Sequence, residues 1–256
     1  MGVTLSMGVL RAIVARFDAD DTEWALTRRQ AVVLAAIPVA IAAIGLSALP
    51  FERVYALLAN EDALVEWVQF LFVLAMIVLA ATLAIALWRQ DHRWLALLYA
   101  VAALGAIFIA GEEISWGQRI LGFLTPAELE DINRQGEANI HNVGSILGLF
   151  NLGVMVVSLA ALVLPVLRWT VWRDRARSVA GYVLIPPFAL ATAFAFPFAY
   201  RAVRLLFLPD AGARTTKYAE FAELCFYFGL VVFFLLARRA LQRTGPPAPE
   251  RPTADT

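Results

Sequence analysis

Six apolar stretches, each long enough to cross a bilayer, are the feature that most constrains this chain. A hydrocarbon core of about 30 Å needs roughly 20 apolar residues per transmembrane helix. Because unpaired backbone groups are too costly in lipid, stretches of this kind must be helices. The sequence therefore predicts an all-α, polytopic membrane bundle of six transmembrane helices. The stretches are Gln30–Leu49, Leu64–Trp88, Trp94–Gly111, Val143–Leu167, Val179–Ala199 and Ala219–Leu236.

The composition agrees with a membrane protein and excludes several other classes. Of 256 residues, 61% are hydrophobic and 16% are charged, whereas a soluble domain is nearer half apolar and a quarter charged. A net charge of +0 argues against nucleic acid as a partner. The single cysteine, Cys225, excludes an intrachain disulfide. Lys217 is the one lysine beside 20 arginines, which is typical of a GC-rich bacterial genome and predicts a bacterial cytoplasmic membrane protein.

The placement of arginine predicts the orientation of the bundle. Alternating loops and tails divide the basic residues 14 to 7, and the richer side faces the cytoplasm under the positive-inside rule. Both termini would then be cytoplasmic. The richer side holds Arg11, Arg16, Arg28, Arg29, Arg89, Arg93, Arg168, Arg173, Arg175, Arg177, Arg238, Arg239, Arg243 and Arg251, and the other side holds Arg53, Arg119, Arg134, Arg201, Arg204, Arg214 and Lys217.

Three regions follow along the chain. Residues 1–29 form an N-terminal segment in which apolar residues recur at helical spacing among arginines, which predicts a short helix lying on the membrane surface. Residues 30–241 form the transmembrane domain. Residues 242–256 include TGPPAPERPTADT, a proline-rich polar run that predicts a disordered cytoplasmic tail.

Acidic residues gather at the opposite side from the arginines, mostly at helix ends. Thirteen of the 21 acids fall on the non-cytoplasmic side. In the second span, Asp62, Glu66 and Gln69 recur along one helical face. In the sixth span, Glu220 and Glu223 enter the membrane in the same way. Spans two and six are therefore expected to bring carboxylates to a common depth.

The stretch GEEISWGQRI, residues 111–120, places a second acidic group at the end of the third span. If the helix continues to about Gly122, Glu112, Ser115 and Arg119 lie on one face. Glu113 and Trp116 then point to a neighbouring face, with Trp116 suited to the membrane interface.

The connection between spans three and four is expected to be ordered. TPAE, residues 125–128, has the pattern of a capping box and predicts a short surface helix. QGEANIHN, residues 135–142, then returns Glu137 and His141 to the start of the fourth span. We expect three helix ends and this loop to converge on one polar pocket, because ionisable groups at membrane depth generally face a cavity or a partner. The alternative is a set of ion pairs, such as Glu112 with Arg119 or Arg201, and solvated helix caps.

The segments GEEISWGQRI and INRQGEANIHN resemble a motif pair of multi-pass bacterial membrane proteins without an assigned activity. The resemblance covers about residues 60–150 and implies a bacterial membrane protein, but no reaction. The histidine-rich, zinc-binding ceramidase-like hydrolases are not matched, since the chain has only His92 and His141.

The first functional hypothesis is a hydrolase or transferase that acts on a lipid or lipid-linked substrate at the outer interface. Carboxylates could bind Mg²⁺, Ca²⁺ or Mn²⁺, which prefer oxygen ligands, so one of these cations is a candidate cofactor. Zn²⁺ is a weaker candidate with one available histidine and no outer cysteine. Alternatively, His141 could act as a general base towards water or Ser115. The candidate residues are Glu66, Glu112, Glu113, Ser115 and His141 for catalysis, Trp116, Gln118, Arg119, Arg201 and Arg204 for substrate binding, and Glu113, Glu137, His141, Glu220 and Glu223 for metal.

Two other classes stay open. In a cation- or proton-coupled transporter or channel, the acids would bind a cation or relay protons, and the prolines of the fifth span would open its backbone to a cavity. Against this, few polar residues occur in the middle of the spans, and Asn151 is the main candidate. In a structural or assembly subunit of a membrane complex, the outer polar surface would bind a partner.

Overall fold

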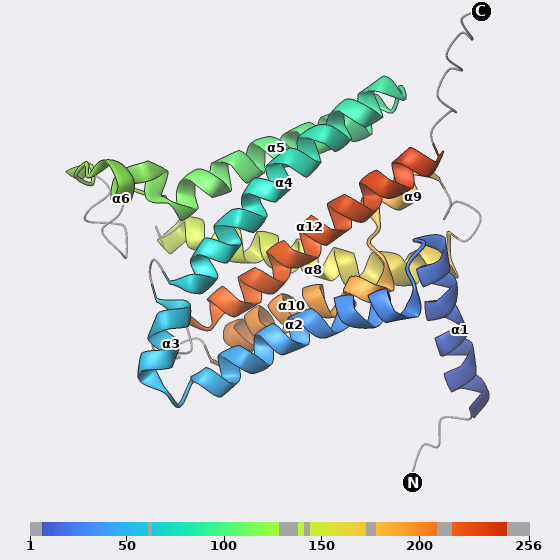
Figure 1. The fold of residues 1–256 in the computed structure, drawn as a ribbon, viewed down its shortest axis with the longest axis horizontal. Coiled ribbons are helices and arrows are strands. Elements are labelled where there is room, and N and C mark those ends of the chain that lie inside the picture. Colours follow the sequence, from blue (N-terminus) through green and yellow to red (C-terminus); the bar gives the residue numbers. More distant parts are fainter. Residues whose placement is uncertain are drawn as a thin grey trace, which may run out of the picture.

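The structure is a computed structural model in which every regular element is a helix within the described residues, 7–60, 63–127, 138–140, 144–172, 178–208 and 217–244 (Figure 1). Side chains are described from residue 15, without those of 119, 120, 144, 145 and 244. Six helical segments are long and apolar enough to span a membrane, which confirms the predicted all-α, multi-pass bundle. The spans are α2 (Arg28–Ala48), α4 (Leu64–Arg89), α5 (Arg93–Glu113), α8 (Gly144–Thr170), the broken α9–η3–α10 segment (Val179–Phe207) and α12 (Ala219–Thr244).

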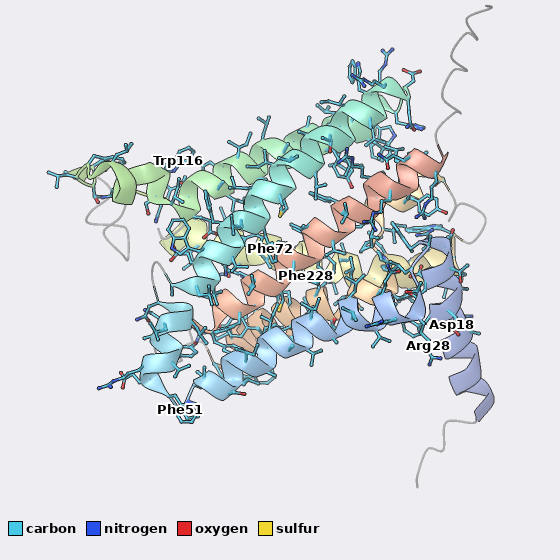
Figure 2. The ribbon with its side chains drawn as sticks, viewed as in Figure 1. Asp18, Arg28, Phe51, Phe72, Trp116 and Phe228 are labelled. Atoms are coloured by element: carbon cyan, nitrogen blue, oxygen red, sulfur yellow. The ribbon has the colours of Figure 1, made fainter. Side chains whose placement is uncertain are left out.

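α12 is the central helix of the bundle. It packs against α4, α10 (Ala191–Phe207), α2 and α9 (Val179–Leu184). Its aromatic residues supply much of that contact: Phe228 faces Phe72 of α4 with ring centroids 6.3 Å apart, and the two are labelled in Figure 2. Because aromatic rings bury large apolar areas, α12 ties the α4–α5 hairpin to the other spans. Any polar group at an end of α12 is thereby held next to three neighbouring helices.

The two ends of the bundle differ in character. One end, called here the carboxylate end, contains the start of α4, the end of α5 and the start of α12. The other, the arginine end, contains the α4–α5 turn, the start of α9 and the end of α12, and α1 (Met7–Glu23) runs across it (Figure 1). An even number of spans returns the last helix to the end where the first began. The assignment of the arginine end to the cytoplasm stays a prediction.

The connection between α2 and α4 contains a short helix, α3 (Glu52–Ala59), that the apolar pattern did not predict. α3 packs against α4 and buries Tyr55 and Ala59. Asn60 ends α3, and its side-chain oxygen accepts a hydrogen bond from Lys217 at 2.9 Å. α3 thus belongs to the carboxylate end and lies beside the entry of both α4 and α12.

The fifth span is broken where Pro186 and Pro187 follow each other. α9 ends at Leu184 and the chain resumes as η3 (Phe188–Leu190) and α10. Proline cannot donate a backbone hydrogen bond, so the carbonyl four residues before each proline loses its helical partner. The Tyr99 hydroxyl donates to the carbonyl of Val183 at 2.7 Å and replaces the bond that Pro187 cannot make. The predicted fifth span is therefore present, and its helix is interrupted at the two prolines.

Asp20 of α1 supplies the partner on the other side of this break. Its carboxylate accepts the Phe188 backbone N–H at 2.8 Å and the indole N–H of Trp169 in α8 at 3.2 Å. The Asp20 side chain is 1% exposed. Burial raises the pKa of Asp20 from 3.8 to about 6, against the lowering effect of these hydrogen bonds and of Arg168. α1 is thus attached to the bundle through a buried acid at a helix break.

A buried ion pair reinforces the same attachment. Glu23 of α1 lies 3.0 Å from the Arg168 guanidinium, which packs between the rings of Trp24 and Tyr182. Arg168 is 1% exposed. A buried charge without its partner is strongly unfavourable, so Glu23 and Arg168 need one another. The predicted helix of the N-terminal segment is present as α1, and its last turn packs into the arginine end, while its position on the membrane surface stays a prediction.

Candidate functional site

Four carboxylates from three helix ends interact electrostatically at the carboxylate end, and we call them the carboxylate cluster. Glu66 lies in the first turn of α4, Glu113 is the last residue of α5, and Glu220 and Glu223 occupy the first two turns of α12. Glu113 interacts electrostatically with Glu223 and Glu66, and Glu220 with Glu223, Glu113 and Glu66. The ends of spans two, three and six thus hold acids that interact electrostatically, while their convergence on one pocket stays a prediction.

Hydrogen bonds are described for three members of the cluster, and each of these carboxylates accepts from a different side chain. The Tyr227 hydroxyl donates to Glu113 at 3.2 Å, and the Gln69 amide donates to Glu220 at 3.2 Å. Gln69 also donates to the Glu220 backbone carbonyl at 2.7 Å, which fixes its side chain. These contacts join α5 to α12 through Glu113 and α4 to α12 through Glu220.

Glu223 has the one cationic partner described within the cluster. Arg201 of α10 lies 2.7 Å from the Glu223 carboxylate. Its Nε donates to the side-chain oxygen of Asn151 in α8 at 3.0 Å. Since charge-assisted hydrogen bonds are about twice as strong as neutral ones, this pair is the firmest contact of the site. Arg201, predicted as a substrate-binding residue, thus belongs to the cluster and connects it to α8.

The carboxylates and their supports differ in exposure. Glu66, Glu113, Glu220 and Glu223 are each partly exposed. The supporting side chains are buried: Gln69 is 0%, Tyr227 1% and Arg201 4% exposed. The acids therefore present oxygen atoms above a layer of fixed polar groups.

Two buried polar atoms of that layer have no hydrogen-bond partner. They are the Gln69 side-chain oxygen, an acceptor, and the Arg201 Nη1 group, a donor. An unpaired buried polar group costs about 1–3 kcal/mol, and such groups in native proteins are rare. Both atoms belong to side chains already bonded to cluster carboxylates. The site thus offers one unused acceptor and one unused donor next to an excess of acids.

Glu112 is turned away from the cluster and holds the returning loop instead. Its carboxylate accepts the Ile140 backbone N–H at 2.7 Å and the Trp116 indole N–H at 2.6 Å. Ser115 accepts from the Asn139 side-chain amide at 3.1 Å. Gln118 accepts the Ala138 backbone N–H at 2.7 Å. We call this set the 138–140 clamp: Glu112, Ser115 and Gln118 on one side, and Ala138, Asn139 and Ile140 on the other.

The backbone of the clamp is a left-handed turn, and the prediction that α5 continues through Arg119 was wrong. α5 ends at Glu113, and Ser115, Trp116 and Gly117 have φ angles of 46°, 52° and 83°. Left-handed conformations are costly for residues other than glycine and persist only where their surroundings impose them. This turn points Glu113 inward and aligns Glu112, Ser115 and Gln118 with the returning segment.

Gly111 allows this turn because Trp116 folds back over it. A Cβ atom at Gly111 would lie 2.8 Å from the Trp116 ring. The ring also packs edge-on against Phe108 at 5.8 Å, and Figure 2 shows Trp116 where α5 meets α6 (Gln118–Leu121). Trp116, predicted to bind substrate, packs on the end of α5 and donates a hydrogen bond to Glu112.

The remaining predicted site residues fall into two groups. Arg204 is partly exposed on α10, one turn beyond Arg201. Glu137 and His141, and the side chain of Arg119, lie outside the described residues, as do most of the predicted short helix after Thr125 and the tail beyond Thr244. The described side chains contain no group of three or more histidines, cysteines or acids arranged to hold a metal. The metal hypothesis therefore stays a prediction.

No family model, curated protein or solved structure matches this chain. The site is therefore interpreted from its own geometry.

The sequence analysis missed Tyr227 and the polar contacts that α1 makes at the arginine end. Tyr227 follows Glu220 and Glu223 at seven and four residues, so the helical period already places the three on one face. Asp20 had a signal of another kind. Two consecutive prolines in a span leave backbone groups that need partners, but the sequence does not say which residue provides them.

Proposed function

We propose that this protein is a membrane-embedded hydrolase or transferase that acts on a lipid or lipid-linked substrate at the carboxylate end. The observation that carries the proposal is the carboxylate cluster itself: partly exposed acids, at a membrane boundary, on a layer of buried hydrogen-bonding groups. Lipid headgroups lie at this depth, whereas the acyl chains contact the apolar faces of the spans. A reacting headgroup bond can therefore meet the acids directly.

Glu113 and Glu223 have different surroundings, so they can take different roles in catalysis. Glu223 accepts from a guanidinium, while Glu113 accepts from the neutral hydroxyl of Tyr227. When two carboxylates of one site have unlike surroundings, one can serve as the proton donor and the other as the base or charge stabiliser. We assign general acid–base chemistry to Glu113, with Glu66 and Glu220 beside it. Arg201 would hold an anionic part of the substrate through Nη1.

The interior of the bundle argues for chemistry at one interface rather than for transport. Between the carboxylate end and the Asp20–Arg168 contacts lies an apolar core that includes Val73, Ala80, Phe194 and Phe233. At the break in the fifth span, the Val183 carbonyl and the Phe188 N–H are both bonded to protein groups. A transport path would need polar groups at intermediate depth, and the described core offers few.

Cellular lipid analysis tests the proposal. Cells expressing the wild-type protein, Glu113→Gln or Glu223→Gln would be compared by mass spectrometry of total lipids and lipid-linked precursors. Glu52→Gln is the matched control, since Glu52 is exposed on α3 at the same end. We expect the wild type and the control to change the same lipid species, and the two site variants to leave that species unchanged at equal protein levels.

The opposite result is equally clear. The enzyme proposal is wrong, and the transporter hypothesis is correct, under two joint results. Expression of the wild-type protein changes the amount of no lipid species, and Glu113→Gln abolishes proton or cation flux in proteoliposomes.

A further inference from the structure

The unused polar atoms of the site define the chemistry of its ligand more closely than the acids alone. Among the described residues, one oxygen each of Glu113, Glu220 and Glu223 takes a hydrogen bond from Tyr227, Gln69 and Arg201, respectively. The second oxygen of each has no described protein donor. The Gln69 side-chain oxygen is buried and also lacks a hydrogen-bond partner, so four acceptor atoms of the site have no described donor.

The negative charge of the site favours a cationic ligand. Glu66, Glu113, Glu220 and Glu223 interact with one another, and Arg201 is paired with Glu223. Like charges this close repel strongly where water is excluded. A cationic ligand group relieves that repulsion. Because the unused atoms are acceptors, a cation with N–H donors fits them better than one without.

Arg201 provides a hydrogen-bond donor for an anionic group of the ligand. Its Nη1 group is buried, unpartnered and adjacent to the Nη2 group that binds Glu223. A guanidinium nitrogen with a free N–H is a donor for phosphate oxygens. The site therefore offers acceptors for an ammonium group and, beside them, a donor for an anion. A primary ammonium carries three N–H donors, which matches the acceptor-rich part.

We propose that the carboxylate cluster binds the zwitterionic headgroup of an amphiphile, a primary ammonium beside a phosphate, with the ammonium on the acids and the phosphate on Arg201. This rests on the proposed function and names the substrate class of that same site. Phosphoethanolamine is the simplest headgroup with this pattern. A trimethylammonium headgroup keeps the charge but has no N–H donor, and a glycerol headgroup keeps the phosphate but has no cation.

Native mass spectrometry of the purified full-length protein tests the specificity. Phosphatidylethanolamine, phosphatidylcholine and phosphatidylglycerol with identical acyl chains would each be titrated in detergent. One hydrogen bond to a charged group contributes about 1.5–3 kcal/mol, so we expect phosphatidylethanolamine to bind about tenfold or more tightly than the other two. Equal binding of the three lipids would overturn the proposal.

Variants place the effect at the site. Glu220→Gln and Gln69→Met should each remove the preference for phosphatidylethanolamine over phosphatidylcholine. Arg201→Lys should weaken the binding of all three phospholipids. Glu52→Gln should change nothing. A preference that survives in both Glu220→Gln and Gln69→Met, with each variant folded by its melting curve, would contradict the assignment.

A soluble competitor separates the two sources of this chemistry. If glycerophosphoethanolamine displaces the lipid at a similar concentration, the ligand is a free phosphoamine, and if it does not, the ligand is the lipid. Both results agree with recognition of an ammonium beside a phosphate. The proposed function fails separately: a lipid product that depends on Glu113 but contains no amine would support the enzyme and refute this specificity.

Discussion

The Glu112 carboxylate accepts the backbone N–H of Ile140 at 2.7 Å, although 28 positions separate the two residues. This bond joins the end of α5 to the segment that returns to α8. It also separates the roles of two adjacent acids, since Glu113 enters the carboxylate cluster while Glu112 holds the loop. The two glutamates of GEEISWGQRI are therefore expected to respond differently to substitution.

Substitution of Glu112 should loosen the 138–140 clamp. In Glu112→Ala, the Ile140 N–H and the Trp116 indole N–H both lose their acceptor. At about 1–3 kcal/mol per unpaired group, this should lower stability by about 2–6 kcal/mol. Thermal melting in detergent measures this, and hydrogen exchange at residues 138–140 should rise. Unchanged exchange in Glu112→Ala would show that the clamp does not depend on this carboxylate.

Gly111→Ala should destabilise the same turn by a steric route. The added Cβ would lie 2.8 Å from the Trp116 ring, so the ring must move and release Glu112. Gly105→Ala is the matched control, because a Cβ there meets nothing within 4 Å and alanine favours a helix by up to about 1 kcal/mol. Melting temperature should fall for Gly111→Ala and hold or rise for Gly105→Ala. Equal shifts would refute the close packing of Trp116 on α5.

Glu113→Gln and Glu223→Gln should move stability in opposite directions. Removing the Glu113 charge relieves repulsion from Glu66 and Glu223, so the melting temperature should hold or rise. Removing the Glu223 charge leaves the Arg201 guanidinium buried without its counterion, which typically costs about 3–5 kcal/mol. Both variants should lose the lipid-dependent activity. A fall in melting temperature for both would mean that repulsion within the cluster is small.

The sequence predicted the membrane class and the helical faces that carry the acids because both follow from local rules. Apolar length fixes a span, and the helical period places Glu220 and Glu223 on one face of α12. The end of α5 was mispredicted because a helical period says nothing about where a helix stops. The left-handed turn at Ser115 and Trp116 depends on the packing of Trp116 over Gly111, which is a tertiary contact. Glu112 therefore received a catalytic role in the sequence interpretation, whereas the structure gives it a structural one.

Attachment of α1 to the bundle should depend on pH through Asp20. The pKa of this buried carboxyl is raised from 3.8 to about 6, so the attached state binds more protons than the detached state between these values. By linkage, the contribution of Asp20 to the attachment of α1 is greatest below about pH 4, and it is lost as the pH rises through about 6. Pulsed electron resonance between spin labels at Arg16→Cys and Arg93→Cys should show a larger detached fraction at pH 8 than at pH 5.

Asp20→Asn provides the control for that measurement, because the substituted side chain does not titrate. Its detached fraction should be independent of pH over the same range. If the wild type and Asp20→Asn follow the same pH dependence, the titration of Asp20 does not govern the attachment of α1.

A double-mutant cycle on Glu113 and Glu220 tests most directly that the carboxylate cluster is one shared site. Melting curves in detergent would be recorded for the wild type, Glu113→Gln, Glu220→Gln and the double variant. Each single change removes the mutual repulsion of the two acids, so the stabilisation in the double variant should fall short of the sum of the single effects by about 0.5 kcal/mol or more. Additive effects would contradict the account, because they would mean that the two carboxylates act independently.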